Sequence, residues 1–139
     1  MAAEVSNWLQ SSPESLSKPT ESDYIEPHAL VDSLETAPDS IAIIDLRKND
    51  FVDGKIKGAF NIPAQSINNS VDDLYDLFEK ADKEVLVIHC ASSRNRATRV
   101  WGWFEDYKRS KGSGPQVVIL KGGFNAFKDL ENSNEWISS

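Results

Sequence analysis

Three uninterrupted apolar runs constrain the fold of this chain more than any other feature. They lie at residues 41–44, 85–88 and 117–120, and a helical pattern separates each from the next. A strand that is apolar throughout is buried on both faces, which is typical of a parallel sheet covered by helices on each side. We therefore predict an α/β fold with a central parallel sheet and helices on both faces.

The 139 residues suffice for one domain with a proper core. Residues 1–22 are rich in Ser, Pro and Glu, which predicts a flexible N-terminal tail. Within this tail, Trp8 and Leu9 are expected to dock against the domain. Residues 23–139 form the predicted domain, with an edge strand at residues 24–25 and a helix that begins at Pro27.

Two further helices are predicted between the apolar runs. Ser70 is expected to cap the first, with Asp73 as its partner in a capping box. The second is expected over residues 95–108. Apolar positions at helical spacing predict the buried stripes, which are Val71, Leu74, Leu77, Phe78 and Ala81 in the first helix and Ala97, Val100, Trp101, Phe104 and Tyr107 in the second. The intervening Asp72, Asp73 and Asp76 are expected to form a solvated face.

Charge and cysteine content narrow the possible functions. A net charge of −7 argues against binding to nucleic acid or to an anionic membrane surface. The single cysteine excludes an internal disulfide and fits a reducing compartment. No apolar run approaches membrane-spanning length and no signal-peptide core is present, so we expect a cytoplasmic or nuclear location. We expect neither a metal nor a cofactor.

The most informative stretch follows the second apolar run. His89 and Cys90 are followed by five small or polar residues and then by Arg96, where a helix is expected to begin. Backbone N–H groups of a strand–loop–helix turn converge on one point and bind anions. The same field favours the thiolate form of a cysteine, and the planar fork of an arginine suits an oxyanion. The pattern predicts a cysteine nucleophile aimed at a tetrahedral oxyanion.

The residues between Cys90 and Arg96 form the predicted oxyanion-binding loop. They are Ala91, Ser92, Ser93, Arg94 and Asn95. Either serine hydroxyl is a candidate to steady the thiolate.

Two neighbouring residues are expected to support this loop. Asp45 ends the first apolar run, so in a parallel sheet it lies at the same carboxyl edge as Cys90. We expect Asp45 to brace the loop by hydrogen bonds rather than to donate a proton, and His89 to hold it from behind. The loop itself contains no carboxylate, so the general acid is unassigned.

Four motifs occur in an order that resembles the rhodanese-like domain, in the branch of the cell-division-cycle dual-specificity phosphatases and fungal-type arsenate reductases. They are Asp45-Leu46-Arg47, residues 51–59, His89-Cys90-x5-Arg96 and residues 119–124. The resemblance covers about residues 23–132. It implies a single rhodanese-like α/β catalytic domain. In two places the chain departs from the family pattern, with Lys55 in place of histidine and Arg96-Ala97-Thr98 in place of Arg-Gly-Pro.

The resemblance implies a phosphatase that acts on a phosphorylated substrate. Cys90 would attack phosphorus and form a phosphocysteine that water hydrolyses, while the loop amides and Arg96 hold the oxygens. Sulfurtransferases of this fold have a loop one residue shorter, which makes sulfur transfer a minor alternative. A non-catalytic binding module is also disfavoured, because Cys90 and Arg96 are both present.

Arsenate reduction is the main alternative. Residues 93–96 resemble the Ser-Lys-Asn-Arg segment of fungal-type arsenate reductases, and Asp50-Phe51 fits them too. Such chemistry needs a second thiol to resolve the arseno-thiolate. Since the chain has no second cysteine, glutathione or a glutaredoxin would have to supply it.

Overall fold

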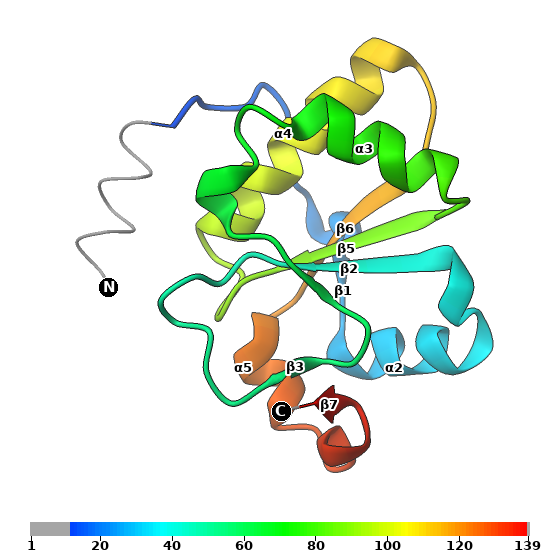
Figure 1. Cartoon of the computed structure of the whole chain (residues 1–139), viewed down its shortest axis with the longest axis vertical. Coiled ribbons are helices and arrows are strands. Elements are labelled where there is room, and N and C mark those ends of the chain that lie inside the picture. The colour runs from blue at the N-terminus through cyan, green and yellow to red at the C-terminus, as the bar shows by residue number, and fades with distance from the viewer. Residues whose placement is uncertain (1–11, 139) are drawn as a thin grey trace.

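A five-stranded parallel sheet lies at the centre of the computed structural model, which describes residues 12–138. Its strands follow the order β1-β6-β5-β2-β4 (Figure 1). They span Tyr24–Ile25 (β1), Ile41–Asp45 (β2), Phe60–Asn61 (β4), Val85–His89 (β5) and Gln116–Leu120 (β6). Every pairing in this sheet is parallel. The predicted parallel sheet and the edge strand at residues 24–25 are confirmed.

Helices cover both faces of the sheet, as predicted. Figure 1 shows α3 (Val71–Lys80) and α4 (Arg96–Lys111) on one face, and α2 (Pro27–Thr36) and α5 (Gly123–Lys128) on the other. Strands β3 (Lys55–Ile56) and β7 (Ile137–Ser138) form a small antiparallel pair. Short 3-10 turns lie at Glu21–Asp23, Pro38–Ser40, Ala64–Ser66 and Ser133–Glu135.

The alternation of side chains along the strands explains why the three runs are apolar throughout. Ile44 and Ile88 pack in the core beneath α3 and α4. Ile43 and Val87, one residue earlier in each strand, pack in the second core with α2 and α5. Successive side chains of a strand point to opposite faces, so a sheet covered on both sides demands apolar residues at every position.

The predicted buried stripe of α3 is partly wrong. Leu77 is 59% exposed and Ala81 is also exposed, whereas Tyr75 is fully buried. The hydroxyl of Tyr75 donates a hydrogen bond to the carbonyl of Pro115 at 2.7 Å, which satisfies the one polar group of the ring. Burial raises the pKa of Tyr75 to about 12, so the phenol keeps its proton. The tyrosine therefore enters the core in place of the leucine.

The polar residues of α3 also differ from expectation. Ser70 occupies the N-cap position, but its side chain makes no cap hydrogen bond, so the predicted capping box is wrong. Asp72 and Asp73 are exposed, as predicted. Asp76 instead accepts a hydrogen bond from the Tyr107 hydroxyl at 3.0 Å and pairs with Lys111 at 2.7 Å, which ties α3 to α4.

Helix α4 carries its predicted stripe and a second buried surface that was not predicted. It begins at Arg96 and ends at Lys111, followed by Gly112 in the left-handed region at φ 97°. Gly102 and Trp103 are buried although they lie outside the predicted stripe. Residues 12–19, here called the N-terminal strap, cover them.

Hydrogen bonds hold the N-terminal strap against α4. The carboxylate of Asp106 accepts the backbone N–H groups of Leu16 and Ser17, both at 2.8 Å. Burial raises the pKa of Asp106, but these bonds outweigh it and leave the pKa below its ordinary value. Trp103 donates its indole N–H to the carbonyl of Pro13 at 2.9 Å.

The N-terminal strap belongs to the segment predicted as a flexible tail, and its described part is packed on the domain. Trp8 and Leu9, which were expected to dock, lie outside the described residues. The boundary at residue 23 stays a prediction. No helix among residues 12–138 is long and apolar enough to traverse a lipid bilayer.

Candidate active site

The centre of the sheet positions the predicted catalytic loop. Strand β5 lies between β6 and β2 and ends at His89. Asp45, the last residue of β2, is in register with His89, so both lie at the carboxyl edge of the sheet. Cys90 follows directly and is only 2% exposed. The structure thus brings Asp45, His89 and Cys90 together, as the sequence predicted.

The start of α5 supports the loop by donating backbone hydrogen bonds to it. The backbone N–H of Phe124 donates to the carbonyl of Cys90 at 3.0 Å, and that of Asn125 donates to Ala91 at 2.9 Å. Gly123 adopts φ +62°, and a Cβ added there would lie 2.5 Å from both of these carbonyl oxygens. Gly123 lies in the motif at residues 119–124, but its sequence position alone predicts no role for it. The consecutive glycines at residues 122–123 were the available signal.

Inside the loop, Ser93 has an unusual conformation. It adopts φ +58° and is 4% exposed, and its hydroxyl has no hydrogen-bond partner among the described residues. Ser92 is half-buried, while Arg94 and Asn95 are exposed. The positive φ of Ser93 bends the chain between Cys90 and the first turn of α4.

Arg96 opens α4 and lies almost completely buried. Its Nη1 donates to Oδ1 of Asp50 at 2.9 Å, and its Nη2 donates to Oδ2. The hydrogen bond to Asp50 raises the pKa of Arg96, burial opposes this, and the adjacent Cys90 raises it further. Conversely, the guanidinium holds the pKa of Asp50 below its ordinary value. From the sequence, Asp50 was visible only as part of a resemblance, because nothing in the local pattern shows that it reaches Arg96.

A buried ion pair lies beneath the loop. Arg47 Nη2 donates to Oδ2 of Asp45 at 2.7 Å and Arg47 Nε donates to Oδ1 at 3.0 Å. Both side chains are at most 1% exposed. The Arg47 guanidinium also lies over the ring of Phe124, 3.9 Å from its centroid. Asp45 is therefore fully engaged by Arg47, which fits a bracing role.

His89 contacts the loop through its ring nitrogen Nδ1. Nδ1 lies 3.1 Å from the Cys90 carbonyl, which can only accept, so Nδ1 carries the proton. Burial lowers the pKa of His89, although the Asp45 carboxylate opposes this, so the ring is neutral near pH 7. Nε2 is 3.9 Å from Asp45 Oδ2 and has no hydrogen-bond partner among the described residues.

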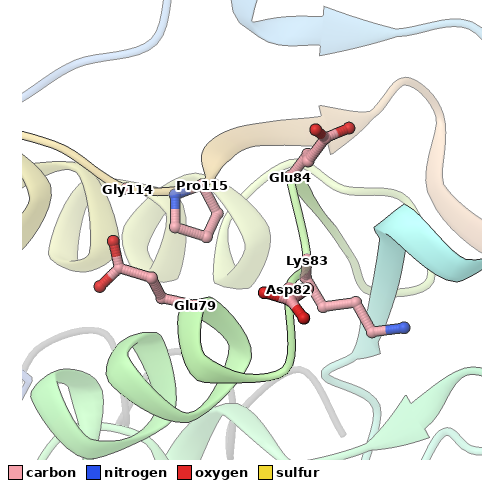
Figure 2. Close-up of a pocket in the computed structure, with 6 residues that line it drawn as sticks. All are labelled: Glu79, Asp82, Lys83, Glu84, Gly114 and Pro115. Atoms are coloured by element: carbon pink, nitrogen blue, oxygen red, sulfur yellow. The ribbon is translucent and has the colours of Figure 1, made fainter.

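Cavities differ sharply in charge between the two edges of the sheet. Figure 2 shows a cavity of about 360 Å³ at the amino edge, where Glu79, Asp82 and Glu84 surround it. Lys83 also lines it, and three carboxylates against one ammonium group make that cavity unfavourable for an oxyanion. A second cavity, of about 210 Å³, lies beside the start of α4, with Lys18 and Arg99 in its wall. Within residues 12–138, no cluster of His, Cys, Asp and Glu suits a metal ion.

Comparisons with known proteins agree with this architecture. Residues 26–130 match the family model of the rhodanese-like domain. The dual specificity phosphatase ibp1 of Schizosaccharomyces pombe is 30% identical over 122 residues, which covers 76% of this chain and 87% of that protein. Arsenical-resistance protein 2 of Saccharomyces cerevisiae is 27% identical over 113 residues, with the same coverage of 76% and 87%.

A solved structure gives the same picture. The As-Sb reductase from Leishmania major superposes with a TM-score of 0.70 at 32% identity, covering 76% of this chain and 75% of that one. The relatives are thus named both as phosphatases and as reductases of arsenic compounds. The fold, the ordered motifs and the family model lead to one conclusion: the chain belongs to the rhodanese-like domain family.

Proposed function

We propose that this protein is a cysteine-dependent phosphatase in which Cys90 is the nucleophile and Arg96 binds the oxyanion. The observation that carries the proposal is the position of these two residues at the two ends of a five-residue loop, which joins the carboxyl end of β5 to the first turn of α4. The dual-specificity phosphatase relative, similar over most of both chains, supports the same reaction class.

The reaction would take place in two displacements. The Cys90 thiolate forms a bond to phosphorus while the bond from phosphorus to the alcohol or phenol oxygen breaks, and the leaving oxygen takes up a proton. Water then attacks phosphorus, the sulfur departs as thiolate, and inorganic phosphate is released. Backbone amides from Ala91 to Arg96 and the Arg96 guanidinium would stabilise the charge on the equatorial oxygens.

Two buried groups would keep the loop in shape during this cycle. The Asp45–Arg47 pair supports its base, and His89 donates to the carbonyl of Cys90. Because Asp45 is buried and engaged by Arg47, we assign it to bracing rather than to proton donation.

Arsenate reduction is the second candidate, and a specific likeness favours it. The solved As-Sb reductase is 32% identical to this chain. In addition, Arg94-Asn95 resembles the Lys-Asn of fungal-type arsenate reductases. Cys90 would displace water from arsenate, and glutathione would then attack the Cys90 sulfur. Two thiols would supply two electrons, leaving arsenite and a mixed disulfide that a glutaredoxin reduces.

One parallel assay separates the candidates. Purified protein and a Cys90→Ser variant are given an aryl phosphate, then arsenate with glutathione and glutaredoxin, then thiosulfate with cyanide. We expect Cys90-dependent release of inorganic phosphate in the first. Thiol-dependent formation of arsenite without phosphate release would show that the protein is an arsenate reductase and not a phosphatase. Formation of thiocyanate alone would show that it is a sulfurtransferase.

A further inference from the structure

Asp50 stands out because it occupies one edge of the Arg96 guanidinium. An arginine has five N–H donors in one plane, and a carboxylate that takes one hydrogen from each terminal nitrogen leaves the edge that includes Nε. The two contacts to Asp50 come from Nη1 and Nη2, so they use only the end of the fork. The contacts to Asp50 therefore do not involve the side edge of Arg96.

The nucleophile interacts with the same guanidinium. Cys90 contributes to the raised pKa of Arg96, so the guanidinium interacts with the thiol as well as with the Asp50 carboxylate that holds its end. Arg96 is only 9% exposed and Asp50 21% exposed, which limits the freedom of either side chain. An arginine without such a partner would have to be ordered by the substrate itself, at the expense of binding.

The segment that carries Asp50 is itself held by the buried ion pair. Arg47 Nη1 donates to the carbonyl of Val52 at 2.9 Å, and Nη2 donates to the carbonyl of Gly54 at 2.7 Å. The N–H of Lys48 donates to Oδ1 of Asp50 at 3.1 Å. The carboxylate is thus fixed from its own backbone as well as by Arg96.

We propose that Asp50 is a positioning residue that orients Arg96, so that the side edge of the guanidinium faces the oxyanion bound at Cys90. This inference rests on the proposed oxyanion site, and it applies equally to phosphate and to arsenate. It also gives the Asp45–Arg47 pair a second task. By holding residues 47–54 in place, the pair links the base of the catalytic loop to the orientation of Arg96.

The test compares Asp50→Asn with Asp53→Asn, a neutralisation in the same connecting segment. Asp53 is exposed and pairs only with Lys128 among the ion pairs of the described residues. Two readouts are measured: kcat/KM on an aryl phosphate, and the concentration of inorganic phosphate or arsenate that half-protects Cys90 from alkylation. Asp50→Asn is expected to lower kcat/KM on the order of 100-fold and to raise the half-protecting concentration, because a misplaced guanidinium loses transition-state contacts. Asp53→Asn is expected to match the wild type in both.

A double-mutant cycle with Arg96→Lys tests whether Asp50 acts by orienting Arg96 or only by stabilising the fold. In an Arg96→Lys background the bidentate contact is already lost, so adding Asp50→Asn is expected to change kcat/KM less than threefold. Asp50→Glu, which retains a carboxylate, is expected to recover part of the loss. Urea unfolding of each variant shows whether the fold is retained.

Three results would overturn the assignment. The first is unchanged protection in Asp50→Asn, and the second is tighter anion binding there, which would make Asp50 a competitor for the site. The third is an equal loss from Asp50→Asn in the wild-type and Arg96→Lys backgrounds. The protection assay needs no turnover, so the first two results are readable even if neither reaction is observed. If no anion protects wild-type Cys90, the oxyanion site itself is wrong, and the role of Asp50 is wrong with it.

Discussion

Gly123 illustrates how a single backbone position shapes the candidate site. It approaches the loop so closely that a methyl group would lie 2.5 Å from the carbonyl oxygens of Cys90 and Ala91. The two hydrogen bonds from α5 to these carbonyls require this approach. Position 123 therefore requires both a positive φ and the absence of a side chain, and glycine meets both requirements.

Gly123→Ala is expected to damage both folding and catalysis. Forcing a non-glycine residue into a sparsely populated backbone region costs about 1–3 kcal/mol, and the clash with the loop adds to it. Gly58→Ala is the matched control, because Gly58 also has a positive φ of 80° but has nothing within 4 Å of the added Cβ. We expect the control to lose only about 1–2 kcal/mol and to keep its activity. Urea unfolding and aryl phosphate turnover measure the two effects, and equal losses in both variants would contradict the close-approach argument.

Among the elements, helix α4 is packed on two opposite faces. One face packs on the sheet, and the opposite face receives the N-terminal strap. Gly102 makes the second contact possible, since a Cβ there would lie 2.0 Å from Ser15 Oγ and 2.5 Å from Ser15 Cβ. The helix whose first residue is Arg96 is thereby clamped between the sheet and the strap.

Gly102→Ala is expected to displace the strap without unfolding the helix. Alanine improves helix propensity by about 1 kcal/mol over glycine, so loss of the strap would not be a loss of α4. The backbone amides of Leu16 and Ser17, which donate to Asp106, are expected to lose their protection from hydrogen exchange. Adding Ser15→Gly removes both clashing atoms and is expected to restore protection. If Gly102→Ala alone keeps full protection from hydrogen exchange, packing of the N-terminal strap does not depend on the absence of a side chain at Gly102.

For the whole molecule, two groups at the candidate site, His89 and Asp50, make stability depend on pH below neutrality. Burial lowers the pKa of His89, and Arg96 lowers the pKa of Asp50. For each lowered pKa, the unfolded state binds more protons than the folded state as the pH falls. Stability is therefore present at neutral pH and is lost on acidification, first as the pH drops below about 6.5, the ordinary histidine value, and again below the ordinary carboxyl range.

The histidine part of this loss is expected to disappear in His89→Gln. Between pH 7 and 5 the free energy of unfolding of the wild type is expected to fall with a slope approaching about 1.4 kcal/mol per pH unit, the value for one proton. The variant is expected to be less stable at pH 7 but nearly flat over this range. His28→Gln is the control, since His28 is the other histidine of the chain and is exposed. Urea unfolding at several pH values provides the measurement, and a wild-type slope retained in His89→Gln would contradict the assignment.

Local pattern was enough to predict a large part of the structure. Strands β2, β5 and β6 were visible as apolar runs, because a doubly covered sheet permits few polar residues. The loop from Cys90 to Arg96 was visible because its residues are neighbours in the chain. The same local reasoning misjudged Leu77 and Tyr75, since the partner that admits the tyrosine, Pro115, lies 40 residues away.

Periodicity and short-range spacing in the sequence therefore set the sheet, its covering helices and the loop from Cys90 to Arg96. Tertiary structure decided which groups meet across long separations: Asp50 on Arg96, 46 residues apart, and the N-terminal strap on α4, about 90 residues apart. The physical reason is that a hydrogen bond or ion pair depends on distance in space and leaves no periodic trace in the chain. The residues that tune the site are drawn mostly from this second group.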